Sequence, residues 1–114
     1  MVLQKRIRIP LYNVQLVVYY GEFEELKKIN DSLGYDEFLE SSFGRSFWNA
    51  ETNRFRLFLR SEERVSVGTI AHECKHMVNY IFKARGIILD VDNDEAECYL
   101  LEWLVNKIYS IIKN

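Results

Sequence analysis

Residues 66–85 read SVGTIAHECKHMVNYIFKAR, and this stretch organises the rest of the chain. Its apolar residues recur at the three- and four-residue spacing of one helix face, which predicts an amphipathic helix. Ser66 is a suitable N-cap, and Gly86 follows at the position where a glycine commonly ends a helix. We therefore expect a helix with one buried stripe, formed by Val67, Ala71, Cys74, Val78 and Ile81.

The polar face of this predicted helix carries His72, Glu73 and His76, an H-E-x-x-H motif. Histidines four residues apart lie about 40° from each other around a helix, one turn along it, so both imidazoles can reach one metal ion. Glu73 adjoins them, where it can take a proton from a water that the metal activates. The motif indicates a Zn²⁺ site with His72 and His76 as ligands and Glu73 as general base. In the alternative interpretation, both histidines lie on a solvated face and Glu73 pairs with a lysine.

A third ligand has to come from outside this helix. A catalytic zinc ion usually takes three protein ligands and a water. The chain has two histidines in all, and Asn79 and Phe82 replace the glycine and histidine of the longer H-E-x-x-H-x-x-G-x-x-H motif. The third ligand is therefore expected to be a carboxylate or, less favourably, Cys98.

An acidic segment, residues 90–97, opens a second predicted helix that runs to about residue 112. Glu95 lies in its first turn, and an antiparallel return after a loop would face it towards the histidines. We select Glu95 as the third ligand, with Glu97 as its chief rival and Asp94 as a weaker one. In the alternative interpretation, Asp92 and Glu95 form a capping box that only starts the helix.

The H-E-x-x-H motif followed by Asp94-Glu95-Ala96 resembles the gluzincin metallopeptidases, whose second motif is a glutamate followed by a small residue. The resemblance covers about residues 69–103. It implies a zincin-like fold and zinc-dependent peptide-bond hydrolysis, with His72, His76 and Glu95 holding the metal and Glu73 as general base.

The chain departs from the larger gluzincins in two respects. Tyr99 stands where thermolysin-like members have an aspartate that orients the first histidine, and within these 114 residues we expect no second domain that walls the cleft. The chain looks more like the small HExxH proteins of bacteria and their phages.

The remaining sequence predicts a small sheet and one more helix. Residues 35–53 lack a regular period and are expected to form a loop. Strands are expected at 4–9, 14–20 and 54–60, and a helix at 22–33 that ends at Gly34. This order predicts a single α+β domain over residues 1–114, a minimal zincin-like domain with its sheet packed on the H-E-x-x-H helix and a second helix at the C-terminus.

Residues 54–60, Arg-Phe-Arg-Leu-Phe-Leu-Arg, alternate in polarity. The favoured interpretation is an ordinary strand with Phe55, Leu57 and Leu59 inward and a solvated basic face. Alternatively, this strand is a sheet edge that pairs with an extended substrate, in which case its arginines would favour acidic peptides.

Composition narrows the functional classes. A net charge of −2 gives no nucleic-acid footprint, and 48% hydrophobic with 28% charged residues is typical of a globular domain. We expect no membrane span, no signal peptide and a cytoplasmic, intracellular location. Cys74 and Cys98 are expected to be free core thiols.

We expect a zinc-dependent peptide-bond hydrolase that acts on a peptide or protein substrate, with its oligomeric state open. Tyr80, Tyr99 and Arg45 are candidates for stabilising the oxyanion. A second hypothesis is a catalytically inactive zinc-binding protein that acts as a partner-binding subunit. A third is a helix pair that binds no metal and has a structural role.

Overall fold

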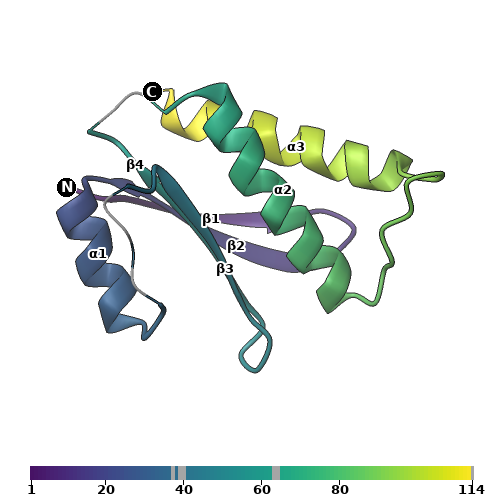
Figure 1. The fold of residues 1–114 in the computed structure, drawn as a ribbon, viewed down its shortest axis with the longest axis horizontal. Helices are drawn as coiled ribbons and strands as arrows, with labels where there is room; N and C mark the ends of the chain where they lie inside the picture. The colour runs from purple at the N-terminus through teal and green to yellow at the C-terminus, as the bar shows by residue number, and fades with distance from the viewer. Residues whose placement is uncertain (37, 39–40, 63–64, 114) are drawn as a thin grey trace.

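A computed structural model describes residues 1–36, 38, 41–62 and 65–113 of the chain. It forms a small α+β domain of three layers (Figure 1). Helix α1 covers one face of the sheet, and helices α2 and α3 cover the other. The elements, in chain order, are β1 (Leu3–Ile9), β2 (Val14–Gly21), α1 (Phe23–Ser32), β3 (Gly44–Asn49), β4 (Arg54–Arg60), α2 (Val67–Ala84) and α3 (Glu95–Ile112).

The sheet is mixed, with the strand order β1-β2-β4-β3. β1 pairs antiparallel with β2, β2 pairs parallel with β4, and β4 pairs antiparallel with β3. Because β4 lies between two strands, both of its edges are occupied, and the interpretation of residues 54–60 as a substrate-binding edge is wrong. The edge strand on that side is β3, which lies inside the segment expected to be a loop.

The main core lies between the sheet and helices α2 and α3. Alternate residues of each strand face this layer, as the period of two requires. In β4 these residues are Phe55, Leu57 and Leu59, which confirms the predicted inward set. Ile7 and Ile9 of β1 extend the same face to the opposite edge of the sheet.

The other face of the sheet is covered rather than solvated. Phe58 is fully buried there and packs in a second cluster with Phe23 of α1. Arg60 is also buried, with its guanidinium 5.0 Å from the centre of the Phe23 ring. The expected solvated basic face is therefore wrong for Phe58 and Arg60, because α1 packs across this end of β4.

Helix α2 begins and ends as the sequence predicts. The Ser66 hydroxyl accepts a hydrogen bond from the Thr69 amide at 3.0 Å. At the other end Gly86 adopts φ +70°, and the amides of Gly86 and Ile87 donate to the carbonyls of Lys83 and Phe82. These two bonds form a Schellman motif, which requires the left-handed conformation that glycine adopts readily.

The buried face of α2 is rotated from the predicted stripe. Val67 is 59% exposed, because it lies in the first turn, beyond the edge of the core. Ile70, Met77 and Phe82 are buried instead, beside the correctly predicted Cys74, Val78 and Ile81. The residues described include no helix long and apolar enough to cross a membrane.

Leu11, in the turn between β1 and β2, has φ +71° and a side chain that is 98% exposed. The left-handed region costs most L-residues roughly 1–2 kcal/mol, whereas asparagine tolerates it. We expect Leu11→Asn to raise the free energy of unfolding by about 1 kcal/mol in urea denaturation. Asn13→Leu, at φ 51°, is the matched control and should lower it. A loss of stability in Leu11→Asn would show that the leucine makes contacts that outweigh its backbone strain.

Candidate metal centre

The two histidines of α2 converge on one point. Their Nε2 atoms lie 3.2 Å apart, and both rings are exposed to solvent. Two nitrogens bound to one tetrahedral zinc ion at 2.0–2.1 Å are separated by about 3.3–3.4 Å. The arrangement therefore fits two ligands of one ion, and the same distance accommodates a hydrogen bond between the rings when no metal is bound.

Glu73 turns away from solvent, towards the sheet. Its side chain is buried, and Oε2 lies 4.0 Å from His72 Nε2. Oε1 accepts a hydrogen bond of 2.8 Å from the hydroxyl of Ser46, whose Oγ also lies 3.0 Å from the Glu73 carbonyl oxygen. The neighbouring Lys75 pairs with Glu97 instead. Glu73 is thus a buried carboxylate held by a hydroxyl. Of the alternative interpretation, the exposed position of both histidines agrees with the structure, whereas the hydrogen-bond partner of the Glu73 carboxylate is Ser46.

Strand β3 brings two residues to this site that the sequence did not reveal. Gly44 and Ser46 alternate on the face of β3 that packs against α2. A Cβ on Gly44 would lie 3.0 Å from Cγ of Glu73 and 3.0 Å from Leu59 Cδ2, so a larger residue here would require these side chains to shift. Gly44, Ser46 and Trp48 occupy alternate positions of β3 and face α2. This period of two could have predicted the strand, but a glycine and a serine at inward positions do not give the apolar alternation by which strands are recognised.

A cleft of about 480 Å³ opens where β3 meets the first turns of α2. It is lined by Ser42, Phe43, Gly44, Ser66, Gly68, Thr69, His72 and Glu73. One histidine and the buried carboxylate therefore face the same hollow. A reacting group that enters it would meet both.

The acidic segment takes a different form from the one expected. Helix α3 begins at Glu95 with Asp94 as N-cap, and no side chain caps it, so the Asp92–Glu95 capping box is not formed. Glu95 is exposed, whereas Glu97 is half-buried and places Oε2 2.7 Å from Lys75 Nζ on α2. Glu97 is thus the carboxylate that the structure brings against the motif-bearing helix.

The structure does not assemble a complete set of ligands. Across residues 1–36, 38, 41–62 and 65–113, no group of three or more His, Cys, Asp or Glu side chains is arranged to hold a metal ion. The structure brings His72 and His76 together, and Glu73 lies beside them. The third ligand, Glu95 or its rivals, stays a prediction.

Neither cysteine joins this site as an obvious ligand. Cys74 is fully buried in the core, and burial, with the nearby Glu73 charge, raises the pKa of its thiol to about 12. Cys98 is free and exposed, so its expected place in the core is wrong. It lies on the first turns of α3, where that helix projects beyond the sheet.

The three candidates for oxyanion stabilisation lie in different places. Tyr80 packs against Trp48, with ring centres 6.2 Å apart, in a hollow along β3. Arg45 lies over the Phe47 ring, on the opposite face of β3 from Ser46. Tyr99 lines a separate groove against the β1–β2 turn. Of the three candidates, Tyr80 is the one that belongs to α2, the helix of the two histidines, and lies beside β3.

Comparison of the chain with protein-family models, with curated proteins and with solved structures gave no match. The geometry of the site therefore carries the functional argument alone.

The Ser46–Glu73 contact can be tested by removing the hydroxyl. Ser46→Ala leaves a buried carboxylate oxygen without its donor, and we expect the free energy of unfolding to fall by about 1–2 kcal/mol in urea denaturation. Ser32→Ala, which removes an exposed hydroxyl, should change it by less than about 0.5 kcal/mol. Equal effects of the two substitutions would mean that Ser46 does not hold Glu73.

Proposed function

We propose that this protein is a minimal zincin-like domain that hydrolyses peptide bonds with zinc. The observation that carries the proposal is the convergence of the two Nε2 atoms at 3.2 Å beside a buried carboxylate in an open cleft. If the two histidines were only polar residues on a solvated face, there would be no reason for Glu73 to be buried and held in one orientation beside them.

His72 and His76 would hold the metal, with a third ligand from the first turn of α3. Glu95 is our candidate, and Glu97 its rival, since it already reaches α2 through Lys75. When bound, zinc supplies Lewis acidity, which lowers the pKa of a water and polarises a carbonyl.

Glu73 would carry the proton transfers. Its carboxylate accepts a proton from the attacking water and delivers it to the leaving amine. Ser46 holds one carboxylate oxygen by its hydrogen bond, which leaves Oε2, on the His72 side, to exchange protons. Ser46 thus acts as a positioning residue.

Strand β3 would bind the substrate. Its outer edge has no neighbouring strand among the described residues, and it runs beside α2 past the cleft. An unpaired edge offers amides and carbonyls to an extended peptide. Further along β3, the indole Nε1 of Trp48 is buried and has no hydrogen-bond partner among the described residues.

The second candidate function is a zinc-binding protein without turnover that serves as a partner-binding subunit. It is favoured by the exposed apolar surface along α3, which lies outside the cleft and includes Tyr99, 67% exposed. Activity measurements separate the two candidates.

We expect the zinc-loaded protein to hydrolyse fluorescein-labelled casein and Glu73→Gln to lose at least about 10²-fold in rate, because the proton acceptor is gone. Zinc content, measured by elemental mass spectrometry, should be unchanged in this variant. Glu24→Gln, an exposed change of the same kind on α1, is the control and should keep full activity. Hydrolysis by Glu73→Gln at the wild-type rate would contradict the role of Glu73, and the absence of hydrolysis by the zinc-loaded wild type would favour the second function.

The third ligand can be assigned by paired substitutions. Glu95→Ala should weaken zinc binding by roughly 10-fold or more in competition with a chromogenic chelator, because one of three protein ligands is lost. Glu97→Ala should change affinity less, since its partner in the structure is Lys75. Unchanged affinity in Glu95→Ala with a large loss in Glu97→Ala would move the ligand to Glu97.

A further inference from the structure

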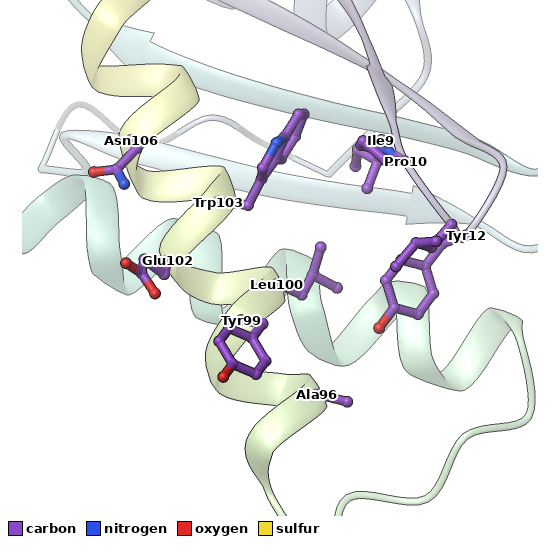
Figure 2. A pocket seen from close by; sticks show the side chains of 10 residues that line it. Ile9, Pro10, Tyr12, Ala96, Tyr99, Leu100, Glu102, Trp103 and Asn106 are labelled. Carbon is purple, nitrogen blue, oxygen red and sulfur yellow. The ribbon is translucent and has the colours of Figure 1, made fainter.

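A second hollow, of about 540 Å³, lies between α3 and the turn that joins β1 to β2. Figure 2 shows Ile9, Pro10 and Tyr12 on one wall and residues of α3 on the other. The α3 wall consists of Ala96, Tyr99, Leu100, Glu102, Trp103 and Asn106. We call this hollow the α3 groove; it shares no lining residue with the cleft that holds His72 and Glu73.

The α3 groove is apolar and open. Tyr99 is 67% exposed and Leu11 98% exposed, although both line it. Leu11 also has φ +71°, a conformation that leucine adopts only at a cost. The exposed Leu11 side chain buries almost no apolar surface within this chain, so it is available to an occupant of the groove.

One wall of the groove, the β1–β2 turn, is held by contacts with α2. Arg85, at the end of α2, donates from Nε to the Tyr12 carbonyl at 2.8 Å and from Nη2 to the Asn13 carbonyl at 3.0 Å. The Tyr12 ring packs against Phe82, with centres 5.8 Å apart. The β1–β2 turn is therefore tied to α2, so this wall does not have to be ordered when an occupant binds.

The dimensions suit a helix. Asn106 lies ten positions after Ala96 on α3, which corresponds to about 15 Å at about 1.5 Å per residue. That length matches about three turns of a second helix lying along α3. Such a helix would place apolar residues at i, i+3, i+4 and i+7 in the groove.

The charges select a basic occupant. Glu102 is the charged residue among the described ones that line the groove, and it stands at its outer rim (Figure 2). The groove begins at Ala96, two residues after exposed Asp94. An apolar trough with an acidic rim and an acidic end complements an apolar stripe flanked by lysines or arginines.

We infer that the α3 groove is the docking site for a basic amphipathic helix of a partner protein. Its apolar stripe packs against Leu11, Tyr99 and Trp103, and its cationic flanks face Glu102 and Asp94. The inference does not depend on bound metal or on peptide hydrolysis.

A designed peptide tests it on the full chain. The probe is a labelled helix of about eighteen residues with leucines at i, i+3, i+4 and i+7 and lysines elsewhere; the comparison peptide carries glutamates in place of the lysines. We expect the lysine peptide to bind in fluorescence anisotropy at least roughly tenfold more tightly than the glutamate peptide. Equal binding, or no binding of the lysine peptide, overturns the inference.

Variants locate the binding. Leu11→Asn, which relieves backbone strain and should fold at least as well, and Tyr99→Ser are each expected to weaken binding about tenfold. Tyr109→Ser, an exposed tyrosine on α3 outside the groove, should leave it unchanged. Glu102→Lys should weaken binding more than Glu24→Lys, which changes the net charge equally.

Two results would assign the groove differently and overturn the proposal. Retention of full affinity in both Leu11→Asn and Tyr99→Ser would place the peptide elsewhere. A concentration-dependent dimer in sedimentation analysis, abolished by Leu11→Asn, would make a second copy of this chain the occupant.

Discussion

A single buried carboxylate joins the helix that carries the histidines to the edge of the sheet. Glu73 is buried between α2 and β3, where an unpaired charge would be costly, and the Ser46 hydroxyl satisfies one of its oxygens. The contact requires α2 and β3 to approach closely, which Gly44 permits. Once Glu73 fixes the orientation of α2, the helical geometry determines where His72 and His76 lie, and both imidazoles are at the surface.

The layers on each side of the sheet hold this arrangement in place. The apolar face of α2 packs on the strands with α3 beside it, while α1 and its aromatic cluster close the opposite face. Lys75 and Glu97 link α2 to the start of α3 on the side away from β3. α2 is therefore braced from two directions, by β3 at Glu73 and by α3 at Lys75. The proposed chemistry and the proposed docking groove lie on different surfaces of the same pair of helices.

Much of the fold could be predicted from local signals. The α+β class, strands β1, β2 and β4, and helices α1, α2 and α3 follow from periodicity, and the ends of α2 follow from Ser66 and Gly86. β3 could not be identified, because a six-residue strand that begins with glycine and carries a serine at its inward position resembles a loop. The strand order depends on pairing between distant segments, so the central place of β4 was not readable from residues 54–60 alone.

Only the part of the candidate site that lies within a single helix could be predicted from the sequence. His72, Glu73 and His76 come together because four-residue spacing on a helix requires it, whereas Ser46 reaches Glu73 across 27 positions of sequence. The pairing of Glu97 with Lys75 depends on how α3 packs, and no pattern within either helix encodes it. Glu95 as third ligand depends on the same packing, so it remains a prediction.

The most direct test of this account is the zinc content of the purified protein and of His76→Ala, measured side by side by elemental mass spectrometry. The account predicts about one zinc ion per chain in the wild type and loss of that zinc in the variant, because two nitrogens 3.2 Å apart are proposed to share one ion. Absence of zinc in the wild type after incubation with the metal, or full retention in His76→Ala, would contradict it.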